Sequence, residues 1–233
     1  MNSVYNGKVL DQTPFKQVYI SYAPSDVGNS IGAALYVVHC IHGVEREYSN
    51  NLSFIGPDFD HKEIIATLNR RKIAYRELAS PEKTVAGLIA SGHIVAHFYG
   101  RMEFGERALG NRSILADPRD PEIKNRINSM IKYRESYRPF APAVLAEKAH
   151  EYFEVKPEYS SRFMESVVPV KAEYRASLPG ITHVDGSGRL QTVEAEEFGR
   201  FHRIIREVEA LTGFAVVLNT SFNINGEPIV LSP

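Results

Sequence analysis

From residue 58 onward, the apolar positions of the chain switch repeatedly between helical and strand spacing. A spacing of three or four residues, as on one face of a helix, recurs at Ile64, Ile65 and Leu68, at Val85, Leu88 and Ile89, at Ile123, Ile127, Met130 and Ile131, and at Phe198, Phe201, Ile205 and Val208. Short apolar runs typical of buried strands lie at 93–99, 113–116, 143–145 and 214–218. This alternation predicts an α/β fold in which helices flank a largely covered sheet.

Two of these helices have recognisable boundaries. Asp60 is followed three residues later by Glu63, which is the capping-box pattern of a helix start. Ser80 followed by Pro81 predicts the start of the next helix, because proline favours the first turn. Gly92 predicts its end.

The first residues of the chain follow a different pattern. Asn6-Gly7 lies between alternating apolar residues, which predicts a β-hairpin over 4–9. A short strand is predicted at 18–20. A unit of this size buries too little apolar surface to be stable by itself. We therefore expect residues 1–50 to form a small N-terminal appendage.

A helix is predicted within this appendage. Ser25 or Asp26 caps its start, Gly43 ends it, and one face carries Ile31, Leu35 and Val38. The polar and glycine-proline composition of 44–57 predicts a linker to the rest of the chain.

Composition narrows the classes of protein to which the chain can belong. Its 233 residues are 43% hydrophobic and 24% charged, as in ordinary globular proteins. Cys40 is the single cysteine, which excludes an internal disulfide and a CxxC metal site. No apolar run approaches the roughly 20 residues of a membrane span, and the start does not have the layout of a signal peptide. We therefore expect a cytoplasmic protein without a membrane partner.

The net charge of −1 argues against nucleic acid as the main partner, because phosphate contacts demand a basic excess. A small anionic ligand needs only a local cluster of cations. Residues 101–138 contain such a cluster, with Arg107 and Arg112 around Ala108-Leu109-Gly110-Asn111, followed by Lys132, Arg134 and Arg138. Arginines beside exposed backbone N–H groups predict a cradle for phosphate oxygens. A solvated face with surface ion pairs is the alternative interpretation.

Two further segments have the composition of binding loops. Asn219 to Asn223 directly follows a predicted buried strand, where polar side chains commonly contact ligands in open α/β sheets. His183 to Gln191 is a glycine-bracketed loop in which Arg189 alternates with Gln191 on an emerging strand. An ordinary polar turn and a hairpin with a surface arginine are the simpler alternatives.

Taken together and in order, these segments resemble one protein family. Residues 100–119, 132–142, 183–192 and 219–228 closely resemble the motifs of the nodulation and antibiotic O-carbamoyltransferases. The resemblance covers essentially all of 52–233. It implies that 51–233 form a YrdC-like domain, a twisted mixed sheet flanked by helices. Such a domain would bind carbamoyl phosphate and ATP and form carbamoyl adenylate for transfer to a hydroxyl acceptor.

The resemblance also implies roles for individual residues. Lys132, Arg138 and Arg189 would be catalytic and would contact phosphate and carbamate oxygens. Arg107, Arg112, Ser221 and Asn223 would bind the nucleotide or the carbamoyl group. Glu106 stands where the family usually has proline, which places a carboxylate beside the expected anion site.

A short N-terminal segment resembles a different domain of the same family. Residues 25–34 are similar to the last motif of its N-terminal ATPase-type domain, where Asp26 would match a ligand of a divalent metal. The histidine ligands lie upstream in the family, and we interpret His39 and His42 as ordinary helix residues. We therefore expect 1–50 to be a remnant of that domain and to hold no metal here. We also expect both ends of the chain to be truncated, and the remainder of that domain to be its partner.

Two alternatives remain beside this interpretation. A threonylcarbamoyl-adenylate synthase of tRNA modification would have a related fold, although the Arg107–Arg119 signature and Asp26 disfavour it. A non-catalytic module that binds a nucleotide or RNA is the other, and the near-neutral charge argues against RNA.

Overall fold

The apolar runs predicted at 93–99, 113–116, 143–145 and 214–218 all form strands of one sheet. The computed structural model describes residues 2–47 and 53–233, and its six-stranded sheet has the order β1-β2-β6-β3-β5-β4. The strands are β1 (Val95–Phe98), β2 (Arg112–Ala116), β3 (Ala141–Leu145), β4 (Ser166–Pro169), β5 (Ser187–Val193) and β6 (Val216–Ser221). Every residue of β2 and β3 is buried, whereas the edge strands β1 and β4 are partly exposed. The fold is thus α/β with a mixed sheet, as predicted.

Among the strands of residues 2–47 and 53–233, one pair is parallel. β3 and β5 run parallel, while the other neighbours pair antiparallel. The crossover from β3 to β5 contains the 3-10 turn Ala146–Lys148, the short helices α6 (Ala149–Tyr152) and α7 (Ala172–Arg175), and strand β4. The sequence pattern gave no signal for β4, α6 or α7, each of which is only four residues long.

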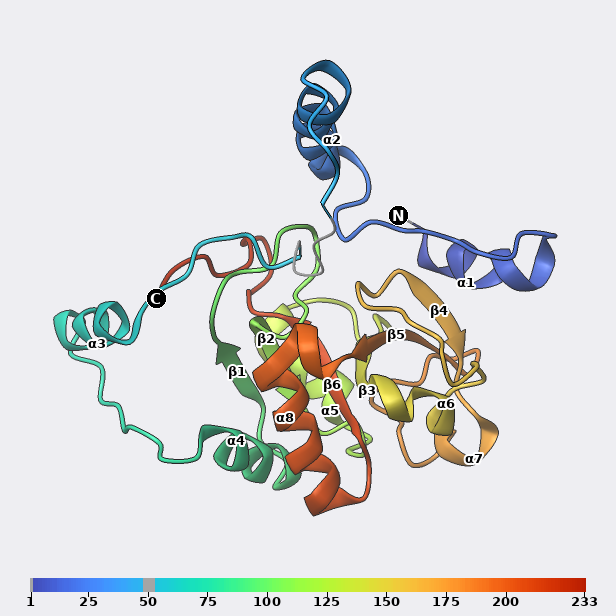
Figure 1. Ribbon diagram of the computed structural model, residues 1–233. Coiled ribbons are helices and arrows are strands. Elements are labelled where there is room, and N and C mark those ends of the chain that lie inside the picture. The colour runs from blue at the N-terminus through green and yellow to red at the C-terminus, as the bar shows by residue number, and fades with distance from the viewer. Residues whose placement is uncertain (1, 48–52) are drawn as a thin grey trace.

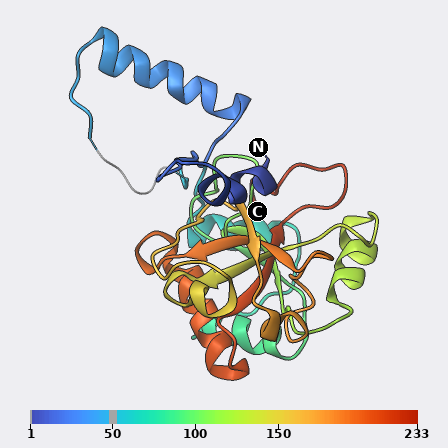
Figure 2. The same ribbon diagram turned by 90° about the vertical axis from the view of Figure 1, so that its right-hand side faces the viewer.

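Helices cover both faces of this sheet. α4 (Pro81–Ala90) packs against α8 (Ala195–Thr212), and Figure 2 shows α8 and α5 (Ile123–Ile127) on opposite sides of the strands. A π-helical turn, η3 (Asn128–Lys132), extends α5. The core joins Ile89 of α4 and Phe201 of α8 to Leu115 of β2, all fully buried. These helices and the strands between them confirm the predicted alternation.

The predicted hairpin over 4–9 is wrong, because this segment belongs to helix α1 (Ser3–Gln12). Asn2 caps the helix by accepting a hydrogen bond from the Tyr5 N–H at 3.0 Å. α1 lies against β4, where a Cβ on Gly7 would collide with the carbonyl oxygen of Val167. The glycine therefore serves a close helix–strand contact instead of a turn. Tertiary packing overrides the local turn preference here.

The strand predicted at 18–20 is also absent from the structure. These three residues have no regular secondary structure, and Tyr19 is 86% exposed. A strand needs ladder partners for its backbone groups, and none of the six sheet strands pairs with this segment.

The predicted helix that follows is confirmed. A 3-10 turn, η1 (Asp26–Gly28), leads into α2 (Asn29–Tyr36) and a π-helical turn, η2 (Val37–Ile41). Figure 1 shows α2 standing away from the sheet, and its predicted apolar face remains exposed, with Leu35 at 48%. The predicted linker at 44–57 falls partly on 48–52, which lie outside the described residues.

The predicted capping box is confirmed at helix α3 (His61–Arg70). The Asp60 side chain accepts from the Glu63 N–H, and the Glu63 side chain accepts from the Asp60 N–H, both at 2.8 Å. Among all helices of the part of the chain that is described, none has the length and apolar character to cross a membrane.

Candidate functional site

The strand register brings four of the polar side chains singled out above to one face of the sheet. Ala143 of β3 pairs with both Gln191 of β5 and Val217 of β6, and paired residues project to the same face. Because side chains alternate along a strand, Arg189 and Gln191 share this face with Asn219 and Ser221. The small side chains of β3 between them leave space above the sheet.

A cavity of about 470 Å³ opens on this face, and we call it the anion cavity. Its lining includes four arginines, namely Arg107, Arg134, Arg138 and Arg189. Ser221 also lines it, together with one carboxylate, that of Glu106. Four of the site residues predicted from the sequence thus lie together, namely Arg107, Arg138, Arg189 and Ser221. The excess of cations fits a ligand with several negative charges.

The Arg189 side chain is held in position by a backbone carbonyl group. Its Nε donates to the Met164 carbonyl oxygen at 2.6 Å, and its Nη2 is buried without a hydrogen-bond partner. Burial, followed by the neighbouring Arg107 charge, lowers the pKa of Arg189 to about 10. Met164 has a φ of 57°, a conformation that costs a non-glycine residue energy and that clusters at functional sites. The site therefore contains a cation whose charge a bound anion would stabilise.

Two more arginines of the cavity are only partly engaged. Arg107 has a buried Nε without a partner. Arg138 is half exposed and pairs with Glu135 at 2.9 Å. Surface pairs of this kind are weak, so Arg138 can exchange Glu135 for a ligand at little cost.

Arg134 was not assigned a role from the sequence. Its Nε donates to Asn128 Oδ1 at 2.7 Å, and its guanidinium lies over the Phe140 ring at 4.8 Å. Burial lowers its pKa, and the nearby Arg138 adds to the effect. The sequence does point to Arg134, because this arginine belongs to the cluster of cations in residues 101–138.

Lys132, Ser221 and Asn223 meet as a cluster. Lys132 is 5% exposed, and its Nζ donates to Ser221 O at 2.6 Å, Asn223 Oδ1 at 2.8 Å and Asn223 O at 2.9 Å, with Ser221 Oγ at 3.2 Å. Ser221 Oγ in turn donates to Asn223 Oδ1 at 2.6 Å. Burial lowers the pKa of Lys132 to about 8, with Arg134 as the second cause. In this state the ammonium fixes the turn after β6, and Ser221 connects that turn to the anion cavity.

Arg112 is not part of this cavity. On β2, Ser113 pairs with Ser221, so Arg112 projects to the opposite face. It is fully buried and donates to the carbonyl oxygens of Tyr99 at 2.9 Å and Gly100 at 3.1 Å. Its guanidinium stacks on Phe98 at 3.6 Å. A ligand-binding role for Arg112 therefore stays a prediction from the resemblance alone.

The expectation of a backbone cradle for phosphate is wrong for three amides of this loop. Glu103, 5% exposed, accepts through Oε1 from the N–H groups of Leu109 at 2.7 Å, Asn111 at 2.8 Å and Arg112 at 3.2 Å. The loop thus folds around a carboxylate of its own chain. These amides are already satisfied and do not need an external anion.

Asp26 lies apart from these residues, in the first turn of η1, and is exposed. Across residues 2–47 and 53–233, no three His, Cys, Asp or Glu side chains gather as a metal site would require. A metal-binding role for Asp26 in a longer protein stays a prediction.

Among the described residues, four of the nine buried side-chain polar atoms without a partner belong to the lining of the anion cavity. Four residues that line it carry such an atom: Arg107 Nε, His183 Nε2, Arg189 Nη2 and Asn219 Oδ1. Buried polar groups are normally hydrogen-bonded, so this group of atoms fits a site that a polar ligand completes. The sequence alone predicts no role for His183 or Asn219, although both lie in the two loop segments 183–191 and 219–223 described above.

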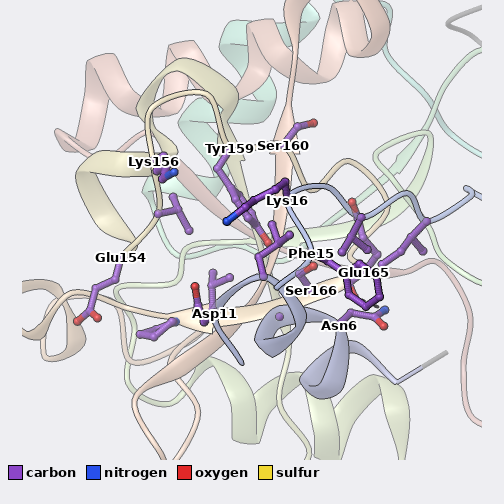
Figure 3. Close-up of a pocket in the computed structure, with 17 residues that line it drawn as sticks. Asn6, Asp11, Phe15, Lys16, Glu154, Lys156, Tyr159, Ser160, Glu165 and Ser166 are labelled. Atoms are coloured by element: carbon purple, nitrogen blue, oxygen red, sulfur yellow. Dashed lines mark hydrogen bonds between the residues drawn. The ribbon is translucent and has the colours of Figure 1, made fainter. Parts of the chain in front are cut away.

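A second cavity of about 400 Å³ lies between α1 and β4 (Figure 3). It mixes acidic Asp11, Glu154 and Glu165 with basic Lys16 and Lys156. Burial raises the pKa of the Glu165 carboxyl. The mixed charges do not favour a polyanion, so we place the candidate site in the anion cavity.

Comparison with known proteins identifies related sequences. The family model described as "Carbamoyltransferase C-terminus" matches residues 86–233. An uncharacterized protein of Synechocystis is 42% identical over 100% of this chain and 42% of its own length. Nodulation protein NolNO of Sinorhizobium fredii is 41% identical over 98% of this chain and 34% of its own. For nodulation protein NolO of Bradyrhizobium diazoefficiens the values are 39%, 99% and 43%. The chain therefore spans less than half the length of these relatives.

Proposed function

The chain belongs to the carbamoyltransferase family, and on that premise we propose that its anion cavity binds carbamoyl phosphate and the phosphates of ATP. The observation that carries the proposal is the convergence of four arginines on one cavity, two of them with a buried nitrogen that lacks a partner. Arginine is suited to this task, because its planar fork donates two parallel hydrogen bonds to phosphate or carboxylate oxygens.

The reaction that we propose has two balanced steps. Water first splits carbamoyl phosphate into carbamate and inorganic phosphate. A carbamate oxygen then attacks the α-phosphorus of ATP, forming carbamoyl adenylate while the bond to pyrophosphate breaks. The first step separates two anions and the second brings carbamate and ATP together, so both barriers depend on positioning and on cations placed in advance. Arg107, Arg134, Arg138 and Arg189 would supply those cations.

We assign Lys132 a supporting place in this scheme. Its Nζ is surrounded by oxygens of Ser221 and Asn223, so its contacts fix the turn that ends at the cavity. Ser221 lines the cavity, and its hydroxyl would turn its single proton from Asn223 Oδ1 to a phosphate oxygen. The relatives are more than twice as long as this chain. The metal site and the site that binds the hydroxyl acceptor in the overall transfer would therefore belong to other parts of a longer protein.

Isothermal titration calorimetry with carbamoyl phosphate tests the proposal. Arg189→Met should weaken binding at least about 10-fold, since hydrogen bonds to charged groups are each worth about 1.5–3 kcal/mol. Arg203→Met is the matched control, because Arg203 is exposed on α8 and pairs with Glu82; it should bind like the wild type. Equal affinity in the Arg189 variant would contradict the assignment of the cavity.

Pyrophosphate release supplies the second readout. With carbamoyl phosphate and ATP together, the wild-type chain should release pyrophosphate, and omission of carbamoyl phosphate should abolish the release. Release that is independent of carbamoyl phosphate would refute the adenylate step.

A further inference from the structure

The side-chain amide of Asn219 has a fixed orientation. Asn219 is 1% exposed, and its Nδ2 donates to Ala108 O at 3.2 Å and to Gln191 Oε1 at 2.8 Å. The Gln191 orientation is fixed as well, because its Nε2 donates to Leu109 O at 2.9 Å. Reversing either amide would place two donors or two acceptors against each other. Asn219 Oδ1 is therefore an acceptor, buried and without a partner.

The ring of His183 is fixed by a similar argument. Ser187 Oγ donates its single proton to Asp185 Oδ1 at 2.6 Å, so it can only accept from His183 Nδ1, which lies at 3.1 Å. The proton of the neutral imidazole is therefore on Nδ1, and Nε2 carries a lone pair. This Nε2 is also buried without a partner. Burial lowers the pKa of His183, and the charges of Lys124 and Arg189 act in the same direction.

These two acceptors differ in kind from the rest of the anion cavity. Asn219 and His183 line it beside four arginines, whose N–H groups are donors toward an anion. An ionised phosphate oxygen is itself an acceptor and cannot satisfy Asn219 Oδ1 or His183 Nε2. A buried acceptor without a partner is costly. A ligand that completes the site should therefore carry N–H or O–H groups beside its phosphate.

We propose that Asn219 and His183 recognise the amino group of the ligand, so that the cavity selects carbamoyl phosphate over acyl phosphates without an N–H group. This inference rests on the proposed function and adds to it the basis of selectivity. The carbamoyl –NH₂ has two protons, and the cavity offers two acceptors. Acetyl phosphate has a methyl group in the same place and would leave both acceptors unpaired. A site built to hydrogen-bond a ligand N–H rejects the analogue that lacks it far more strongly than a shape filter does.

Calorimetry with three ligands tests the selectivity. The wild-type chain is titrated with freshly prepared carbamoyl phosphate, with acetyl phosphate and with inorganic phosphate. We expect carbamoyl phosphate to bind at least about 10-fold more tightly than acetyl phosphate, because two buried acceptors depend on it.

Two variants test the residues. His183→Phe removes one acceptor at a half-buried position, and His93→Phe is its control at an exposed position outside the cavity lining. Asn219→Ser withdraws Oδ1 but retains a hydroxyl that can donate to Gln191 or Ala108, which protects the fold. In both cavity variants the preference for carbamoyl phosphate should fall at least about 5-fold, while the affinity for acetyl phosphate stays unchanged.

The possible outcomes distinguish a failure of this inference from a failure of the proposed function. Binding of none of the three ligands to the wild type would overturn the proposed function itself. Equal affinity of the wild type for carbamoyl and acetyl phosphate would overturn only the recognition of the amino group. Full preference in both His183→Phe and Asn219→Ser would do the same.

Discussion

Replacing Glu103 by alanine should strongly destabilise the fold. Its Oε1 accepts from three backbone N–H groups, and those of Leu109 and Arg112 belong to buried residues. Leaving a buried donor unpaired costs about 1–3 kcal/mol. The loss for these two groups alone is therefore about 2–6 kcal/mol, a large part of the 5–15 kcal/mol that typically stabilises a domain.

The size of the effect should depend on the chemistry of the replacement. Glu103→Gln retains an acceptor oxygen, but it loses the charge, which roughly halves the strength of each bond. We expect a loss of about 1–3 kcal/mol for this variant. Glu106→Ala is the matched control in the same loop, because Glu106 is exposed, and surface substitutions usually change stability by less than about 0.5 kcal/mol.

Urea unfolding followed by circular dichroism measures these differences, with an unchanged m-value as evidence that only stability has changed. The order of stability should be wild type and Glu106→Ala, then Glu103→Gln, then Glu103→Ala. A Glu103→Ala variant as stable as the Glu106→Ala control would refute the claim that the carboxylate supports the loop.

Two further predictions concern pH. The affinity for sulfate, a phosphate analogue of constant charge, should fall as pH rises through about 8 in the wild type, because Lys132 loses its proton there; calorimetry on Lys132→Met should find weaker binding without this change. Glu165→Gln should raise the melting temperature by about 2–4 °C at pH 8, on the order of 1 kcal/mol, and give no gain at pH 4. The sign follows because burial raises the pKa of the Glu165 carboxyl, so the folded state binds the proton more tightly and wild-type stability falls as pH rises through that pKa; an equal gain at both pH values would contradict it.

Most of the helices and strands could be predicted from the sequence, because the spacing of apolar residues within a segment depends only on that segment. The spacing of Ile123, Ile127 and Ile131 and the run at 113–116 needed no knowledge of their neighbours. β4 and α1 show the limit of this reading. β4 is an edge strand of only four residues, too short to give a periodic signal, and α1 uses its Asn-Gly pair for contact with that strand. Both depend on a partner that is distant in sequence, with Asn6 Nδ2 donating to Glu165 O at 2.8 Å.

The arginines of the candidate site show the same limit at the level of single residues. Arg107 and Arg112 are equally close to glycines in the sequence, and the pattern gave them the same role. Their separation depends on register, since the pairing of Ser113 with Ser221 turns Arg112 to the other face. A shift of one residue reverses every side chain of a strand, and no local motif encodes that shift.

The Glu103 contacts change what kind of anion site the loop can form. In a glycine-rich phosphate loop, backbone N–H groups bind the anion and side chains assist. Here three of those N–H groups bind the Glu103 carboxylate, so the proposed recognition of an anion would depend on side chains such as Arg107 and Arg189. Side chains differ from one another in charge, reach and hydrogen-bond direction, as the donors of Arg189 and the acceptor of Asn219 do. A cavity of this construction can discriminate among phosphates by the group attached to them, which a uniform row of backbone donors cannot.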